Sequence, residues 1–303
     1  MTDNAKAMVL GSFLGDSLAL GVHWIYDQAQ IARLHDRLDG LKAPAPGSYH
    51  TTKQAGDFTH YGDQTLLLLQ SVADKSGFDP ADFSARWRAM FEGGYTGYVD
   101  RATRNTLSQL AAGWDPQDAG SVSDELSGAA RIAPLVYVYR SDSEAMVAAC
   151  RAQAALTHNN AKIVDASEFF ARTTHAVLAG VSPIEAMTVA ITDRFPGSPL
   201  HGWFKQGLDA AGEDSILAIA RFGQSCHVDG AFQSVVQLIA RHQGAPAEAL
   251  VDSAMAGGDS AARNMIVGMV LCAQSGMEGI PPDWLGALGK RSEIEALLAR
   301  VLV

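Results

Sequence analysis

Hydrophobic residues recur along this chain with the spacing of helices. In residues 5–20 the apolar side chains stand at positions 7–10, 13, 14 and 18–20, which is too dense for a surface helix and predicts a buried one. Gly11 and Gly15 within it permit close packing against a neighbour. Similar signals predict helices over 62–75, from Pro80 onward, and over 100–112, 127–139, 143–157, 163–179, 183–194, 201–222, 228–243, 246–256, 259–276 and 291–302.

Strand signals are scarce. The best alternation is at Leu135–Tyr139, and because Pro134 precedes this segment it fits a helical turn equally well. Residues 43–47 and 113–121 have the composition of loops, and no repeat or linker divides the chain. We therefore predict an all-α single domain over residues 1–303, with strand content far below the usual figure of about 20–25%.

The composition indicates a folded, globular chain. Of its 303 residues, 48% are hydrophobic and 18% are charged, which provides a sizeable core. The formal net charge of -10 argues against generic binding to nucleic acid or to an anionic membrane. The three widely spaced cysteines fit neither a disulfide framework nor a Cys-x-x-Cys metal site. No leader or membrane span is evident, so we expect a cytoplasmic protein.

Two short segments far apart in the chain carry the candidate chemistry. Residues 61–65 read Tyr-Gly-Asp-Gln-Thr, and residues 257–263 read Gly-Gly-Asp-Ser-Ala-Ala-Arg. Each places a carboxylate, Asp63 or Asp259, where a loop is predicted to enter a helix. The free N–H groups and the dipole of a helix start stabilise a carboxylate there. Helix capping and a role in a ligand site are therefore both open for these residues.

These segments resemble the two metal-site motifs of the ADP-ribosylglycohydrolase family, Thr-Asp-Asp-Thr and Gly-Gly-Asp-Thr/Ser-Asp-Thr. Residues 11–21 are similar to the family's opening Gly-Asp-Ala-Leu-Gly helix. The stretches 23–27 (His-Trp-Ile-Tyr-Asp), 223–232 and 257–263 are similar to the branch that contains J1-crystallins and selenoprotein J. The resemblance runs from about Ala7 to Trp284, and it implies an all-α fold.

The chain departs from the family's metal-binding pattern. The signature positions that match are Asp63, Thr65 and Asp259, and those that differ are Gly62, Gln64, Ala261 and Ala262. His23 stands where metal-dependent members carry a Glu. Because each Mg²⁺ takes about six oxygen ligands, we predict that the site does not hold two Mg²⁺ ions. At most one divalent ion, Mg²⁺ or Mn²⁺, is expected at Asp63 and Asp259; with His23 as a further ligand, Zn²⁺ or Fe²⁺ would also suit the site.

The resemblance implies that the counterparts of these residues converge at the ends of several helices. The predicted catalytic residues are then Asp63, Asp259 and His23: the carboxylates would stabilise positive charge on the sugar carbon, and the imidazole would transfer protons. Two carboxylates facing His23 should raise its pKa unless burial dominates. The predicted substrate-binding residues are Gln64, Thr65, Arg263, Asp16 and Tyr95.

Structural roles remain open for four of these residues. His23 could be a buried histidine packed beside Trp24, and Asp16 could make a buried structural hydrogen bond. Arg263 follows Asp259 by one helical turn, so it could pair with that residue or bind a substrate carboxylate or phosphate. The loop around Tyr95 could line a pocket or only turn the chain.

Two functions follow from the resemblance and the departures. The first is hydrolysis of a small polar substrate, of the ADP-ribosyl or another glycosidic type, at an altered metal site. The alternative is a non-catalytic protein on the same fold, either crystallin-like or ligand-binding. The sequence leaves the substrate, the bound metal and the oligomeric state open.

Overall fold

The computed structural model describes residues 2–301, and this part of the chain is built of helices. It contains no strand and only two isolated β-bridges, Ser121–His158 and Glu125–His227. The predicted all-α class is confirmed. The helices are α1 (Thr2–Leu20), α2 (Gln28–His35), α3 (His60–Lys75), α4 (Pro80–Glu92), α5 (Arg101–Ala111), α6 (Ser127–Ala130), α7 (Ala133–Val138), α8 (Ser143–Ala155), α9 (Ala161–Leu178), α10 (Pro183–Arg194), α11 (Pro199–Asp209), α12 (Ser215–Phe222), α13 (Val228–Arg241), α14 (Pro246–Met255), α15 (Ser260–Ser275), α16 (Pro282–Ala287) and α17 (Arg291–Val301).

Side-chain caps fix the starts of several helices. Asp79 accepts hydrogen bonds from two N–H groups in the first turn of α4, which begins at Pro80 as predicted. Thr59 caps α3 by accepting from the Tyr61 N–H. Asp100 caps α5 in the same way. The last two caps matter for function, because α3 and α5 both begin beside the candidate site.

Two predicted helices are each divided in the structure. Residues 201–222 form α11 and α12, because Asp214 begins a new helix by accepting from the Leu217 N–H. Residues 127–139 form α6 and α7, with Pro134 in the first turn of α7, and the ambiguous segment after it is helical. The short helices α2 and α16 have no counterpart in the prediction. The N-cap of α2 is Asp27, whose side chain accepts from the Ala29 N–H.

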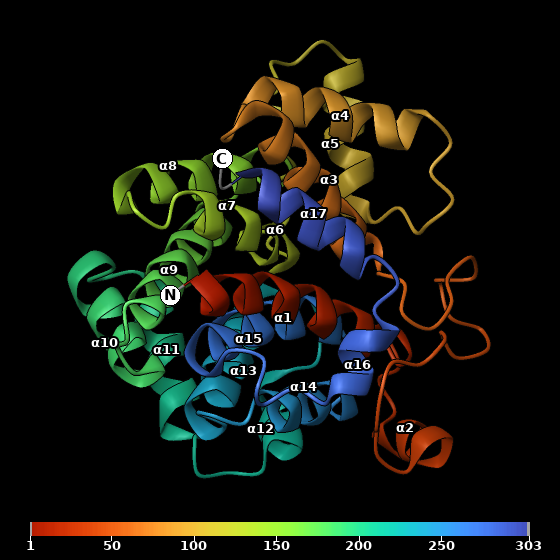
Figure 1. Cartoon of the computed structure of the whole chain (residues 1–303), viewed down its shortest axis with the longest axis vertical. Helices are drawn as coiled ribbons and strands as arrows, with labels where there is room; N and C mark the ends of the chain where they lie inside the picture. Colours follow the sequence, from red (N-terminus) through yellow and green to blue (C-terminus); the bar gives the residue numbers. More distant parts are fainter. Residues whose placement is uncertain (1, 302–303) are drawn as a thin grey trace.

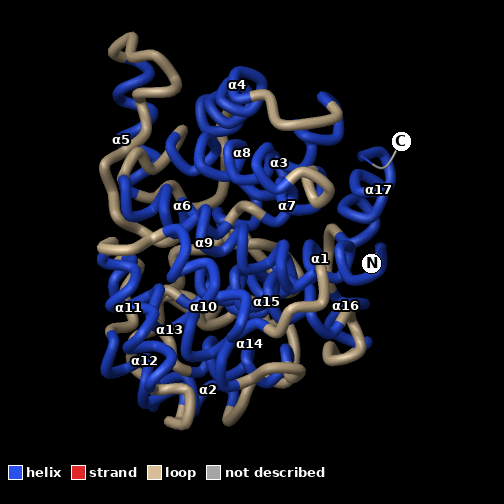
Figure 2. Tube along the Cα trace, turned by 90° about the vertical axis from the view of Figure 1, so that its left-hand side faces the viewer, coloured by secondary structure: helices blue, strands red, loops and turns tan. Residues whose placement is uncertain are grey.

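Helix α1 runs through the middle of the molecule (Figure 1). Helices α3, α4, α7 and α17 lie on one side of it and α11 to α14 on the other. Helix α15 lies alongside α1 in both views (Figures 1 and 2). Buried apolar side chains of all these helices join one contiguous core, so a single domain encloses both candidate segments.

Glycines let α1 and α15 approach each other closely. A Cβ atom at Gly11 would lie 2.6 Å from the carbonyl oxygen of Gly268, and one at Gly15 would overlap the carbonyl group of Asn264. The order of these contacts shows that the two helices are antiparallel. The end of α1 therefore meets the start of α15, which brings the residues after the first helix beside those before the second.

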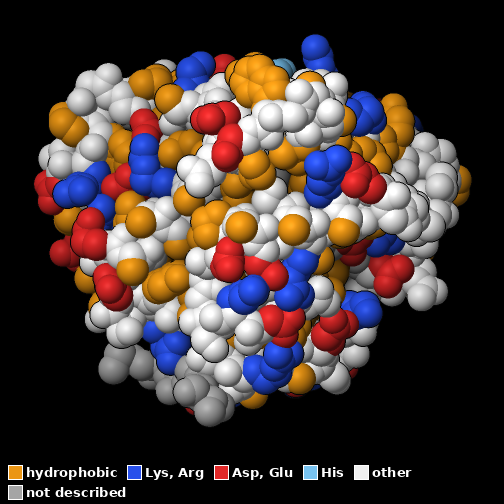
Figure 3. Space-filling view, turned by 90° about the horizontal axis from the view of Figure 1, so that it is seen from above, with side chains coloured by type: hydrophobic (Ala, Val, Ile, Leu, Met, Phe, Trp, Pro, Cys, Tyr) orange, Lys and Arg blue, Asp and Glu red, His pale blue; other side chains and the backbone are white. Residues whose placement is uncertain are grey.

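Charges of both signs are interspersed on the face seen in Figure 3. Ion pairs such as Arg86–Asp74 and Arg300–Asp74 join α3 to α4 and to α17. Exposed pairs of this kind contribute little to stability, about 0–1 kcal/mol each. Within residues 2–301, no helix is both long enough and apolar enough to cross a membrane.

The close contact of α1 with α15 predicts that Gly15→Ala destabilises the protein. The added methyl group must push against the backbone of Asn264, and overpacking of this kind costs about 1–3 kcal/mol. Gly202→Ala is the matched control, because a Cβ atom there meets no atom within 4 Å. Alanine in that helix should be neutral or stabilising by up to about 1 kcal/mol. Urea unfolding measures both, and equal free energies of unfolding for the two variants would contradict the account.

Candidate functional site

Backbone hydrogen bonds join the end of α1 to the loop before α15. The Trp24 N–H donates to the Gly258 carbonyl at 2.9 Å, and the Gly258 N–H donates to the Ile25 carbonyl at 2.8 Å. Gly257 and Gly258 have φ values of 77° and 68°, a region that favours glycine. A Cβ atom at Gly257 would lie 2.5 Å from the Ile25 carbonyl oxygen. The glycines of the second motif are therefore needed for this approach.

Trp24 adopts a backbone conformation that is uncommon for its type. Its φ is 65°, and a non-glycine residue held there costs about 1–3 kcal/mol. The indole ring packs against His23, Tyr98 and His50, with centroid distances of 4.4, 4.8 and 5.5 Å. Backbone strain of this kind concentrates at functional sites, and here it directs an aromatic ring into the candidate site.

The Asp259 carboxylate is directed into the protein and does not cap its helix. Asp259 is the N-cap residue of α15 but makes no side-chain capping bond. Its Oδ2 accepts a hydrogen bond from the Tyr61 hydroxyl at 2.9 Å, and Oδ1 has no protein partner. Burial raises the pKa of Asp259, and the hydrogen bond from Tyr61 opposes that shift. An unpartnered oxygen on a buried carboxylate is costly, which favours a ligand-binding role over capping.

Three buried histidines lie close to one another, and two of them, His23 and His60, also pack against Tyr61. The ring centroids of His23 and His50 are 5.3 Å apart, those of His50 and His60 5.7 Å, and those of His23 and His60 6.5 Å. None of the six ring nitrogens has a hydrogen-bond partner in the protein. His60 Nε2 does lie 3.1 Å from Oδ2 of Asp100, although outside hydrogen-bond geometry. We call His23, His50 and His60 the histidine cluster.

Burial keeps two members of the histidine cluster neutral. It lowers the pKa of His50 to about 3 and the pKa of His23 well below its ordinary value, and the nearby His60 acts in the same direction. The rise expected for His23 from facing carboxylates is therefore absent, because desolvation dominates. A neutral imidazole offers one donor and one acceptor, which suits uncharged hydroxyl groups.

A cavity of about 200 Å³ opens beside His23 and Trp24. Most of its wall comes from residues 21–26 and 45–49. Tyr26 and Tyr49 belong to this wall and are 52% and 63% exposed, so aromatic surface extends from the cavity to the solvent. Rings of this kind provide large, rigid contact area together with a polar group.

Asp63 binds a different set of partners. Its Oδ2 accepts from Lys53 Nζ at 2.5 Å and from the Tyr95 hydroxyl. The Asp63 side chain is 20% exposed and that of Lys53 14%. The structure thus brings His23 and Asp259 to Tyr61, and it brings Tyr95 to Asp63.

Asp16 reaches from α1 to the start of α3. Its carboxylate accepts from the N–H of Thr59 at 2.8 Å and from the hydroxyl of Thr59 at 2.5 Å, and burial raises its pKa to about 7. A Cβ atom at Gly62 would overlap this carboxylate, so the missing side chain of the first motif makes room for Asp16. Thr65 donates within α3 to the Tyr61 carbonyl at 2.8 Å. Both Asp16 and Thr65 are therefore engaged in holding α3.

Gln64 is fully engaged in the protein. Its Oε1 accepts from Trp87 Nε1 at 2.8 Å and from an Arg131 nitrogen at 2.9 Å, and its Nε2 donates to the His60 carbonyl at 2.9 Å. Arg131 is itself buried and also donates to Gln153 and Thr157. Burial lowers the pKa of Arg131 to about 10, so it stays charged near neutral pH.

Arg263 holds the loop before α15. Its guanidinium donates to the carbonyls of Gly257 at 2.5 Å, Ser253 at 3.2 Å and Gln224 at 3.4 Å. Burial lowers its pKa to about 10, so it too remains a cation. Its donors stabilise the loop that carries Asp259 through backbone carbonyls, and no ion pair joins Arg263 directly to the Asp259 carboxylate.

The donor set at the two motifs does not fit a pair of Mg²⁺ ions. The Asp63 carboxylate is paired with Lys53, and the only side-chain oxygen of Gln64 already accepts two hydrogen bonds. Among residues 2–301, no group of three or more His, Cys, Asp and Glu side chains is arranged to hold a metal ion. We therefore assign no reaction step to a metal.

Sequence reasoning missed Lys53, His50, His60, Tyr61 and Arg131. Tyr61 and His60 adjoin the first motif, but their importance depends on contacts with residues far away in the chain. Lys53 and His50 lie in a loop without a motif. The available signal was the pair of histidines at and shortly before the start of α3, and it does not show that their rings meet.

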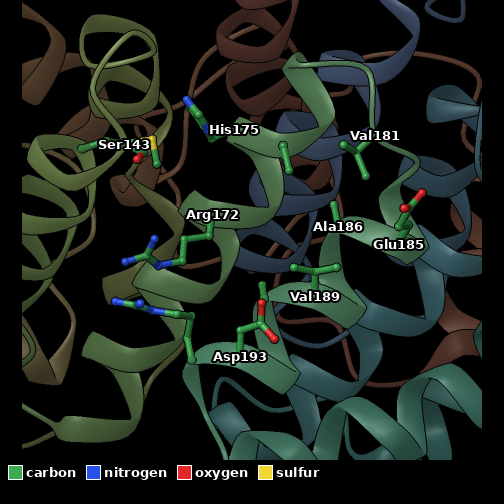
Figure 4. A pocket seen from close by; sticks show the side chains of 12 residues that line it. Ser143, Arg172, His175, Val181, Glu185, Ala186, Val189 and Asp193 are labelled. Carbon is green, nitrogen blue, oxygen red and sulfur yellow. The ribbon is translucent and has the colours of Figure 1, made fainter.

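A second cavity, of about 340 Å³, lies between α8, α9 and α10 (Figure 4). Its polar groups are largely satisfied by the protein. Arg172 donates to Glu168 and to Glu144, and His175 Nε2 lies 3.0 Å from the Arg140 carbonyl oxygen. One buried atom of its wall, Nη2 of Arg172, has no partner, whereas the cluster around Tyr61 holds all six ring nitrogens of its histidines and Oδ1 of Asp259 without one.

Acid should destabilise the protein through His50. The unfolded chain takes up a proton near pH 6.5, whereas folded His50 does so only near pH 3. The stabilisation is complete above the first value and is lost as the pH falls towards the second, by about 1.4 kcal/mol per pH unit. His50→Asn should reduce this dependence by the contribution of one histidine and leave that of His23, whose pKa is also lowered by burial; urea unfolding between about pH 5 and pH 7 measures it. His201→Asn, at an exposed histidine of α11, should leave it intact, and equal slopes for the two variants would refute the prediction.

Comparisons with known proteins place the chain in a family. The model of the ADP-ribosylglycohydrolase family matches residues 1–303. Crystallin J1A of Tripedalia cystophora is 25% identical over 312 residues, covering 96% of this chain and 94% of that protein. Crystallin J1B of the same organism is 24% identical over 320 residues, covering 99% and 96%. A solved structure described as an ADP-ribosylglycohydrolase-related protein complex has a TM-score of 0.77 at 25% identity, covering 99% of this chain and 97% of that one. Since the family model spans the whole chain and the helical fold agrees with it, this chain belongs to the ADP-ribosylglycohydrolase family.

Proposed function

We propose that the protein hydrolyses a glycosidic bond in a small polar substrate, of the ADP-ribosyl or a related type, at the site around Tyr61. The observation that carries the proposal is the buried Asp259 carboxylate, whose Oδ1 has no protein partner. The other oxygen of this carboxylate accepts a hydrogen bond from the Tyr61 hydroxyl, and the centroid of the Tyr61 ring lies 5.8 Å from that of the His23 ring. Buried polar groups without partners are rare in folded proteins. A ligand rich in hydroxyl groups would provide hydrogen-bond partners for Oδ1 of Asp259 and for the ring nitrogens of the histidine cluster.

The chemistry requires stabilisation of positive charge on a sugar carbon. Water bonds to the anomeric carbon, the bond from that carbon to the leaving nitrogen or oxygen breaks, and the proton that the water loses ends on the leaving group. Positive charge develops on the carbon as the leaving group departs. In its ionised form the Asp259 carboxylate would stabilise this charge, and the effect would be strong because the surroundings are buried. Neutral His23 would accept a hydrogen bond from the attacking water and orient it.

Aromatic surface favours a sugar or nucleoside ligand. Trp24, Tyr26 and Tyr49 contribute to the cavity wall, and flat rings pack well against the faces of sugars and bases. Asp63 and its partner Lys53 are partly exposed, so they could meet a further polar part of the same ligand.

Binding without catalysis is the second candidate function. Two relatives that this chain matches over nearly its full length are named crystallins, and the donor set of the two motifs is altered. On this alternative the same pocket would bind a ligand, and no bond would be broken.

Asp259→Asn tests the proposed reaction. The change keeps the shape of the side chain and removes its charge, so turnover should fall about 10²–10³-fold, as it does when one electrostatic stabiliser is removed. Hydrolysis of a panel of ADP-ribosyl and simple ribosyl glycosides, followed by chromatography of the released sugar, measures the effect. Asp209→Asn, at an exposed aspartate of α11 paired with Lys205, is the control and should keep full activity.

Two outcomes would contradict the proposed hydrolytic function. One is a wild-type protein that binds members of the panel but releases no sugar, which would favour the binding function. The other is full activity in Asp259→Asn. Circular dichroism would confirm that each variant keeps its helical content.

A further inference from the structure

Two positively charged side chains of the protein contact the first of the two motifs, residues 62–65. Lys53 Nζ lies 2.5 Å from Oδ2 of Asp63. An Arg131 nitrogen lies 2.9 Å from Oε1 of Gln64. Asp63 and Gln64 occupy the two central positions of this motif, where the family pattern has a pair of carboxylates. Each position is therefore bonded to a positively charged side chain of the protein itself.

The position of Lys53 is fixed by its loop. The Lys53 N–H donates to the His50 carbonyl at 3.1 Å, closing a turn, and the ring of His50 belongs to the histidine cluster. The ammonium group also lies 5.9 Å from the centroid of the Tyr95 ring, within the range of a cation–π contact. The Tyr95 hydroxyl donates to the same Asp63 oxygen. Backbone, ring and carboxylate together hold the ammonium group against Asp63.

Lys53 and Arg131 differ in their access to solvent. Arg131 is buried and donates to Gln64, Gln153 and Thr157, so it is fully engaged in the protein. The Lys53 side chain is 14% exposed. An ammonium group has three N–H donors, of which the contact with Asp63 uses one. Lys53 is thus the cation that keeps donors for a ligand.

We propose that Lys53 takes the place of a metal ion at Asp63. Its ammonium group forms an ion pair with the carboxylate that a divalent ion would need as a ligand. Its remaining N–H donors are offered to an oxygen-rich or anionic part of a ligand. Arg131 supplies the second fixed positive charge, next to Gln64. The site then holds its positive charge without a metal. This inference concerns the same site as the proposed hydrolase, but it does not require that any bond be hydrolysed.

Mn²⁺ binding to the full-length protein tests this inference, with the free ion measured by electron paramagnetic resonance. The wild type and Lys53→Arg should leave millimolar Mn²⁺ free, because the cation on Asp63 is kept. Lys53→Met releases the carboxylate of Asp63, so it should bind Mn²⁺ at least about tenfold more tightly than the wild type. Lys53→Gln is the second neutral variant and should behave in the same way.

The matched control is Lys205→Met. Lys205 pairs with Asp209 at the same distance of 2.5 Å, but on an exposed surface, and its loss should not change Mn²⁺ binding. A wild type that holds Mn²⁺ stoichiometrically would overturn the inference, as would equal affinity in the wild type and both neutral Lys53 variants. Neither result depends on glycoside turnover, so the inference and the proposed hydrolase can fail separately.

Discussion

The antiparallel contact between α1 and α15 is the constraint on which the site depends, because it unites two segments that the chain separates by most of its length. Gly11, Gly15 and Gly268 leave no space for side chains between the two helices. The end of one helix is thereby placed against the start of the other. The two backbone hydrogen bonds that Gly258 makes with Trp24 and Ile25 then fix how the two loops are aligned.

The site that results is costly in itself. It contains a carboxylate with an unpartnered oxygen, neutral imidazoles without protein partners and a tryptophan with positive φ. Each feature opposes folding by an amount on the order of 1–3 kcal/mol. A contiguous core drawn from all the helices offsets these costs. Rigid surroundings of this kind preorganise polar groups for a ligand, which a flexible site cannot do.

The fold was largely predictable from the sequence, because helix periodicity and caps are local properties. Pro80 marked the start of α4, and the dense apolar run before Leu20 marked the buried α1. The predictions failed where a local signal was weak. Asp214 divides one predicted helix, and the chain turns between α6 and α7 just before Pro134, where periodicity alone suggested continuity.

The site was predictable only in part. The motifs located Asp63 and Asp259, and the close helix packing was visible in Gly11 and Gly15. The partners of the two carboxylates could not be found in this way, since Lys53 and Tyr61 are recognisable only through the contacts they make. The protonation of His23 could not be predicted either, because it depends on desolvation, which is a property of the folded structure.

Histidine ring nitrogen NMR on ¹⁵N-labelled protein, titrated with an ADP-ribosyl or ribosyl ligand near neutral pH, tests the central claim most directly. The claim is that a ligand binds against buried, neutral imidazoles at the site around Tyr61. It predicts that His23 and His50 show the ring shifts of neutral imidazole before ligand is added, and that these signals move on binding while that of exposed His201 does not. Protonated rings at His23 and His50, or binding that leaves their signals unchanged, would contradict it.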